Sequence, residues 1–128
     1  MVVVETKVEV KPLELNPQPL NSLKKVSDMR TIIGKVNFVG FDCVVVKTQY
    51  VENDRTALVL EDVNDGATVA TATVNIPNVD LAPDEVLIKN YSENDGMLNT
   101  LINAGIVEKS DRKVCNGFVT IPICKLLF

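Results

Sequence analysis

The sequence predicts an α+β fold, in which a curved, mainly antiparallel sheet packs against one principal helix at about residues 93–104. Valine and threonine are abundant while aromatic residues make up only 5% of the chain, a bias that favours strands. Turn signals such as Asp65-Gly66 and Asn116-Gly117 separate short β-rich segments. One segment places its apolar residues at helical spacing. A chain of 128 residues is long enough to bury one core.

The first part of the chain, residues 1–30, is predicted to be an N-terminal strand arm that precedes a single α+β domain at 31–128. Valines at positions 2, 4, 8 and 10 alternate with charged residues at 5, 7 and 9, the pattern of a half-buried strand. Prolines at positions 12, 17 and 19 then predict an extended connector. Such an arm folds back on its own sheet or adds to a neighbour's sheet edge, which would make a homo-oligomer. Folding back is the simpler expectation.

The next segments predict the strands of the sheet. The stretch "TIIGKVNFVGFDCVVVKTQYV" is too long for one straight strand, and Gly34 and Gly40 are the expected places for a turn, bend or bulge. A hairpin is predicted from about Thr56 to Ile76, with Asp65-Gly66 supplying residues that tolerate positive φ.

The remaining strands lie on either side of the predicted helix. Pro77 ends the hairpin, and "VLIKN" is predicted as a short strand before the helix. In the tail, Asn116-Gly117 predicts a turn that precedes an apolar strand. Pro122 in that strand lacks an N–H group, so we expect the strand to lie at a sheet edge or to carry a bulge.

The helix is predicted from "NYSENDGMLNTLINAG", which begins at Asn90. Ser92 is a good N-cap, and acids in the first turn suit the positive end of the helix dipole. Gly105 stands where a left-handed C′ residue belongs, followed by Ile106 closing back on Leu101. The same stretch is also a candidate binding surface, formed by Asn90, Tyr91, Ser92, Glu93, Asn94 and Asp95. Capping accounts for most of these residue types, but it requires neither Tyr91 nor Asn94.

The residue types exclude several kinds of catalytic and metal site. The chain has no histidine, which removes Ser-His and Cys-His nucleophile pairs and histidine-ligated zinc. Its three cysteines, Cys43, Cys115 and Cys124, form no Cys-x-x-Cys pair and are expected to be buried, reduced thiols. Neither "NDG" turn fits the EF-hand spacing, and no glycine loop matches a phosphate-binding pattern.

The sequence therefore predicts a non-enzymatic protein with no metal and no cofactor. A paired-carboxylate hydrolase that uses Glu61, Asp62 or Glu93 stays open, although solvated charge beside turns explains these acids better. The net charge of −4 disfavours nucleic acid, because lysine and arginine supply most of the affinity for phosphates. No apolar run reaches the length of a signal peptide or a membrane span, so we expect a cytoplasmic protein without membrane contact.

Three phrases, in order, resemble a known family: "RTALVLEDVNDGATVATATVNIPN", "VLIKNYSENDGMLNTLINAGIV" and "GFVTIPIC". The family consists of small α+β proteins of unknown function from bacteriophages and bacterial mobile elements. The resemblance covers about residues 50–124 and implies an intracellular, single-domain protein in a bacterial host cell. It implies no activity, substrate or catalytic residue. If the family shares its polar phrase for a functional reason, that phrase corresponds here to residues 90–94.

Three functions are consistent with these observations. The first is a non-enzymatic phage or mobile-element accessory protein that binds a host protein. The second is a virion structural or assembly protein, associated with the virion, whose N-terminal arm contacts another phage protein. The third is a module that sequesters a small ligand between helix and sheet.

Overall fold

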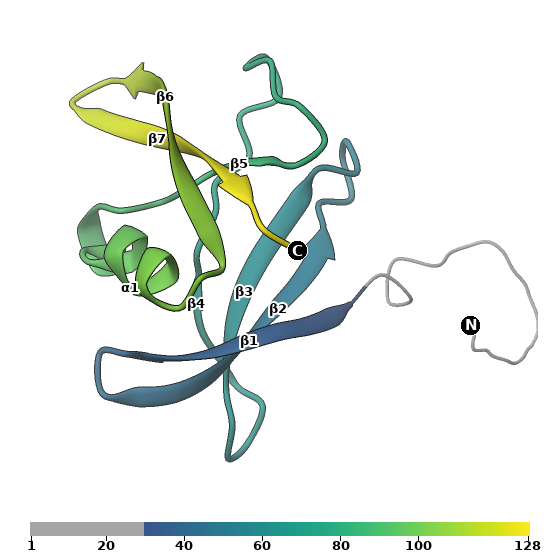
Figure 1. Cartoon of the computed structure of the whole chain (residues 1–128), viewed down its shortest axis with the longest axis vertical. Helices are drawn as coiled ribbons and strands as arrows, with labels where there is room; N and C mark the ends of the chain where they lie inside the picture. Colours follow the sequence, from purple (N-terminus) through teal and green to yellow (C-terminus); the bar gives the residue numbers. More distant parts are fainter. Residues whose placement is uncertain (1–29) are drawn as a thin grey trace, which may run out of the picture. The chain divides into compact units, whose positions relative to one another are not determined.

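The structure is a computed structural model that describes residues 30–128, within which Ile32–Phe128 form one compact unit. The elements in chain order (Figure 1) are β1 (Thr31–Phe38), β2 (Phe41–Gln49), β3 (Thr56–Asp62), β4 (Thr68–Thr71), β5 (Glu85–Leu87), the 3-10 turn η3 (Ser92–Asn94), α1 (Met97–Asn103), β6 (Val107–Asn116) and β7 (Val119–Leu126). The expected mainly antiparallel strand pairing is confirmed, and the one α-helix of the described residues, α1, is shorter than the predicted helix at 93–104. The predicted strand arm lies outside the described residues.

The strands form two sheets rather than one curved sheet. One has the order β1-β2-β3-β4 and the other has the order β5-β7-β6. The predicted 56–76 hairpin exists as β3 and β4, with Gly66 at φ 75° in its turn, but its second strand ends at Thr71.

The hairpin ends early because the chain changes partners at Ala72. The N–H of Ala72 still donates to Leu58 O of β3 (2.8 Å), whereas its carbonyl accepts from Lys89 N beyond β5 (2.8 Å). Thr73 then forms an isolated antiparallel bridge with Ile88. A single extended segment therefore joins the two sheets.

The two glycines of the first long β segment have different roles. Gly40 forms the two-residue β1–β2 turn together with Val39, and both residues have positive φ (86° and 46°). This confirms the expected turn at Gly40. Gly34 lies inside β1, where an added Cβ would stand 3.1 Å from Ile106 Cδ1. Glycine at that position lets Ile106 approach the strand backbone closely.

The proline in the last strand is accommodated by an irregularity in its neighbour. The strand β7 is central in its sheet, so the expected edge position is wrong. The expected bulge in the proline-containing strand is also absent, because the irregularity lies in its partner β6, where the register shifts between Lys109 and Lys113, the residue opposite Pro122. Ser110 Oγ donates to Ile123 O (2.6 Å) within this irregular segment.

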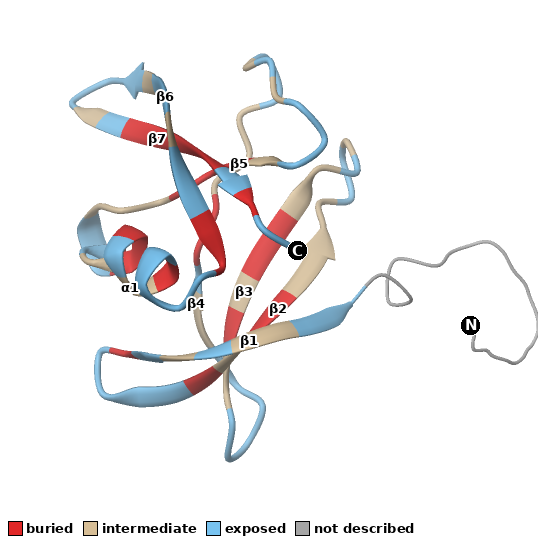
Figure 2. Ribbon diagram, viewed as in Figure 1, coloured by how far each residue is buried: buried red, intermediate tan, exposed pale blue. Residues whose placement is uncertain are grey.

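A main core lies between the two sheets and the helix, and buried positions follow β2, β3, β7 and α1 (Figure 2). Its buried members come from nearly every element: Phe38, Cys43, Val45, Leu58, Leu60, Ala72, Val86, Ile88, Met97, Leu98, Leu101, Ile106, Val107, Cys124 and Leu126. Burying a side chain of the size of leucine contributes about 1.5–3 kcal/mol, so this cluster is the main source of folding stability.

Candidate functional site

The helix that the candidate segment was expected to open begins later than predicted. Ser92 is not its N-cap, because Ser92–Asn94 form a separate 3-10 turn and α1 begins at Met97. The cause is the Asp95-Gly96 pair: Asp95 has ψ 127° and Gly96 has φ 92°, and neither value continues a right-handed helix. Asp65-Gly66 is the same kind of turn pair, and Gly66 also has a positive φ (75°).

The end of the helix agrees with the sequence prediction. Gly105 is left-handed at φ 74°. Its N–H donates to Ile102 O (3.0 Å), and the N–H of Ile106 donates to Leu101 O (3.0 Å). These two bonds are those of a Schellman ending, so the expected helix stop is confirmed.

Two of the six candidate residues serve the fold. Asn90 Oδ1 accepts from the N–H of Leu98 (2.8 Å) and so caps α1 from a position well before it. Asn94 is only 1% exposed, and its Nδ2 donates to Thr71 O (2.7 Å). This bond satisfies the last carbonyl of β4. Neither side chain is free to serve as a recognition group.

Three other candidates, Ser92, Glu93 and Asp95, are exposed. Glu93 forms an ion pair with Lys89, and Lys89 Nζ lies 5.6 Å from the centroid of the Tyr91 ring. The hydrogen bond between the two charged groups lowers the pKa of Glu93 and raises the pKa of Lys89. Tyr91 itself is half-buried, and it packs against a second apolar cluster.

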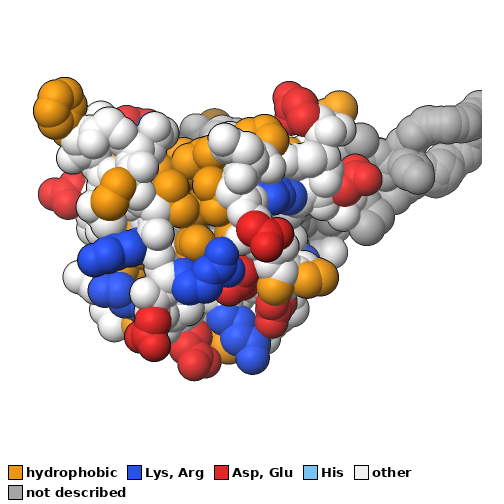
Figure 3. Space-filling view, turned by 90° about the horizontal axis from the view of Figure 1, so that it is seen from above, with side chains coloured by type: hydrophobic (Ala, Val, Ile, Leu, Met, Phe, Trp, Pro, Cys, Tyr) orange, Lys and Arg blue, Asp and Glu red, His pale blue; other side chains and the backbone are white. Residues whose placement is uncertain are grey.

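This second cluster, called here the outer apolar face, lies on the side of sheet β5-β7-β6 that faces away from the main core. Its centre is buried and consists of Leu87, Ile121 and Ile123. Around that centre pack seven side chains that are only partly buried: Val74, Ile76, Val79, Leu81, Tyr91, Val114 and Val119. Figure 3 views the end of the molecule at which the β6–β7 hairpin and the loop before β5 lie in Figure 1, and it shows apolar side chains gathered there with lysine and arginine nearby.

The outer apolar face was missed from the sequence, although β7 carries a signal for it. Side chains of a strand alternate between the two faces of its sheet. In β7, Ile121 and Ile123 belong to the outer apolar face while Cys124 and Leu126 belong to the main core. A strand that is apolar at both odd and even positions indicates a sheet with two covered faces.

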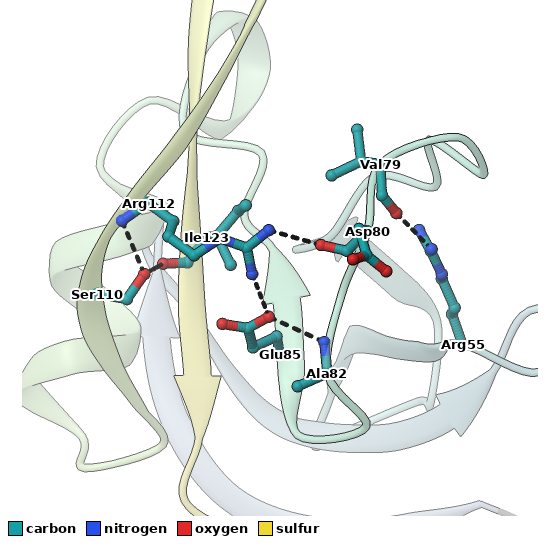
Figure 4. Close-up of polar contacts among 8 residues, drawn as sticks. All are labelled: Arg55, Val79, Asp80, Ala82, Glu85, Ser110, Arg112 and Ile123. Atoms are coloured by element: carbon teal, nitrogen blue, oxygen red, sulfur yellow. Dashed lines mark hydrogen bonds and ion pairs between the residues drawn. The ribbon is translucent and has the colours of Figure 1, made fainter.

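Two arginines hold the loop at residues 76–84, several of whose side chains pack on this face (Figure 4). Arg55 donates to Ile76 O (3.0 Å). It also donates to Val79 O, and Figure 4 draws this second bond. Arg112 donates to Asp80 O (2.6 Å) and forms an ion pair with Glu85 (2.6 Å).

Glu85 is the acceptor at the base of this loop. Its Oε1 also accepts from the N–H of Ala82 (2.9 Å). That hydrogen bond, and after it the hydrogen bond and positive charge of Arg112, lower the pKa of Glu85. The loop is therefore fixed by charge-assisted bonds to its carbonyls and to one carboxylate.

A fully exposed aromatic residue borders the outer apolar face at the β6–β7 turn. Gly117 (φ 66°) and Phe118 form this two-residue turn, and the next residue, Val119, belongs to the face. Glycine at the first position suits such a turn, but the turn has no need of an aromatic side chain at the second. Phe118 extends apolar surface into solvent.

The reactive groups of the described chain are dispersed. Cys43 and Cys124 are buried, and burial raises the pKa of both thiols, that of Cys124 to about 11. Cys115 is exposed, so the expectation of burial is wrong for this residue. Within residues 30–128, no group of three or more cysteine, aspartate or glutamate side chains is placed to hold a metal ion. The described residues also include no helix long and apolar enough to cross a membrane.

Comparisons with protein-family models, with curated proteins and with solved structures find no match to this chain.

Proposed function

We propose that this protein is a non-enzymatic accessory protein of a bacteriophage or bacterial mobile element, and that it binds a protein of its bacterial host through the outer apolar face. The observation that carries the proposal is the incomplete burial of that face. Three buried residues are surrounded by seven apolar side chains that each keep part of their surface in water.

The energetic argument concerns the surface that remains exposed. Apolar area removed from water contributes about 25 cal/mol per Å², so the partly buried valines and isoleucine of the face have a further gain available on association. Contiguous apolar surface with a polar border is typical of protein interaction sites. Aromatic residues supply much of the energy at such sites, and Tyr91 and Phe118 stand at the border of this face.

The surroundings of the face support a protein partner over other partners. The net charge of −4 opposes binding to nucleic acid. The 76–84 loop is held by Arg55 and Arg112, which keeps the apolar side chains in place before a partner arrives. The phage or mobile-element origin rests on the resemblance of residues 50–124 to that family, which also favours a cytoplasmic location.

The test is affinity capture from native bacterial lysate with the tagged full-length chain, read by mass spectrometry. Val119→Lys places a charge in the outer apolar face, whereas Thr120→Lys adds the same charge one residue later on the opposite side of β7. We expect the unsubstituted chain and Thr120→Lys to recover the same host protein near equal stoichiometry, and Val119→Lys to lose it.

Other outcomes would reject the proposal. Equal recovery by both variants would exclude the outer apolar face as the binding surface. Recovery of virion proteins, or only of the protein itself, would favour the assembly function and its N-terminal arm. Circular dichroism of each variant ensures that a lost partner reflects a lost contact rather than lost folding.

A further inference from the structure

A second surface lies at one end of the four-stranded sheet. Because β1 to β4 follow one another as neighbours, the β1–β2 and β3–β4 turns lie at the same end, below the helix in Figure 1. A hydrogen bond from Val63 N to Asp42 O (3.0 Å) links the two turns directly. Residues 39–42 and 62–66 are called here the turn end of the sheet.

The turn end exposes apolar side chains where turns normally carry small polar ones. Val39 is 65% exposed, Phe41 is 48% exposed and Val63 is 45% exposed. Val39 also has φ 46°, a left-handed conformation that is sterically costly for a β-branched residue and that asparagine or glycine adopts readily. A residue that is strained in its own turn and keeps most of its surface in water calls for a different explanation.

The charge of the turn end has a single sign. Asp42, Asp62 and Asp65 lie in it, and the segments 36–46 and 56–88, from which its strands and turns come, contain no lysine or arginine. Each carboxylate accepts a hydrogen bond from a neutral donor: the Asn37 side chain, Asn64 N and Ala67 N. The ion pairs within residues 30–128 involve other carboxylates, so none of the three is paired with a lysine or arginine of the described chain. Besides burial, Asp62 and Asp42 raise the pKa of the neighbouring Cys43 thiol, as negative charges do.

We infer that the turn end is a second docking surface, which takes a basic protein segment carrying an apolar side chain. Lysine or arginine of the segment would meet Asp42, Asp62 and Asp65, while its apolar side chain would contact Val39, Phe41 and Val63. The same negative charge repels nucleic-acid phosphates and anionic lipid, so the chemistry selects a protein partner. The turn end and the outer apolar face use different residues, so one chain would join two proteins.

The test is a titration of the isotope-labelled full-length chain, followed by backbone amide chemical shifts. The probes are an oligolysine peptide and the same peptide with two interior leucines. We expect saturable shifts concentrated at residues 39–42 and 62–66. The leucine-containing peptide should bind about tenfold more tightly, because partial burial of a leucine is worth about 1.4 kcal/mol.

Variants separate the charged and the apolar contributions. The pair Asp62→Asn with Asp65→Asn keeps the turn acceptors and should weaken both peptides several-fold. The matched pair Glu108→Gln with Asp111→Asn removes the same charge from exposed positions of β6 and should leave binding almost unchanged. Val39→Asn suits the turn and keeps the fold, and it should remove most of the advantage of the leucine-containing peptide.

Three results would overturn the inference. These are shifts spread over acidic residues throughout the chain, equal weakening by the two charge-matched pairs, and the absence of saturable shifts with either peptide.

Discussion

The two faces of sheet β5-β7-β6 differ in how completely they are covered, although the same strands supply both. On the inner face, Cys124 and Leu126 join a core in which fifteen side chains are buried. On the outer face, Ile121 and Ile123 are buried, but the side chains around them are only partly covered. The comparison separates two sets of apolar residues: the inner set is fully covered and stabilises the fold, whereas the outer set is only partly covered, and we propose that it binds a partner.

The largest effect should follow removal of a side chain from the main core. Leu101 is fully buried in α1, and Leu101→Ala should lower the free energy of unfolding by about 3 kcal/mol, since alanine keeps the helix but leaves a cavity. The neighbouring Ile102 is exposed, so Ile102→Ala should cost under about 1 kcal/mol. Urea unfolding followed by circular dichroism measures both, and similar losses would mean that the helix is not packed as described.

A smaller effect is expected at the buried amide of the candidate segment. Asn94→Ala removes a side chain that is only 1% exposed together with its hydrogen bond to Thr71 O, which should cost about 2 kcal/mol. Ser92→Ala, at an exposed position of the same turn, should cost much less. Thermal unfolding of the two variants checks the difference. An Asn94→Ala variant as stable as the unsubstituted chain would contradict the folding role assigned to this side chain.

The strained turn should respond in the opposite direction. Val39→Asn replaces a β-branched residue at φ 46° by one that tolerates this conformation, so the free energy of unfolding should rise by about 1 kcal/mol. Lys35→Asn, an exposed control inside β1, should not stabilise the protein, because asparagine disfavours strands. A loss of stability in Val39→Asn would show that the valine side chain contributes to packing after all.

The smallest effect concerns the pH dependence at the 76–84 loop. The pKa of Glu85 lies below its ordinary value of 4.5, so its ionised form is favoured in the folded state. The stability that ionised Glu85 contributes is fully present above pH 4.5, and it is lost as the pH falls through the lowered pKa. Glu85→Gln should therefore be less stable than the unsubstituted chain above pH 4.5, and this difference should narrow as the pH falls below 4.5. Urea unfolding at a series of pH values checks this, and a deficit that stays constant below pH 4.5 would contradict the assigned bonds.

The elements that were predicted correctly depend on neighbours in the sequence. The Gly66 turn, the Gly105 helix stop and the Asn116-Gly117 hairpin are each set by residues whose backbone preferences act locally. The predicted helix start at Ser92 is wrong for a local reason as well. Asp95-Gly96 forms a turn with Gly96 at φ 92°, so the helix begins only at Met97.

The features that were not predicted depend on contacts distant in sequence. The change of partner at Ala72, which divides one sheet into two, requires Lys89 to be in place. The loop contacts of Arg55 and Arg112 have no sequence signature, because arginine binds carbonyl groups wherever the fold brings them. Of the six candidate residues, Tyr91 packs on the outer apolar face. The side chains of Asn90 and Asn94 form hydrogen bonds to the backbone that stabilise the fold.

The difference between the two faces is tested most directly by the unfolding free energy of a chain carrying Val114→Thr and Val119→Thr. The substitution keeps shape and strand preference but adds a hydroxyl group, which is costly only where water is excluded. We predict a loss below about 1 kcal/mol, because both positions on the outer apolar face reach water. A loss near the 3 kcal/mol or so expected for Leu101→Ala would contradict the account and make this face part of the core.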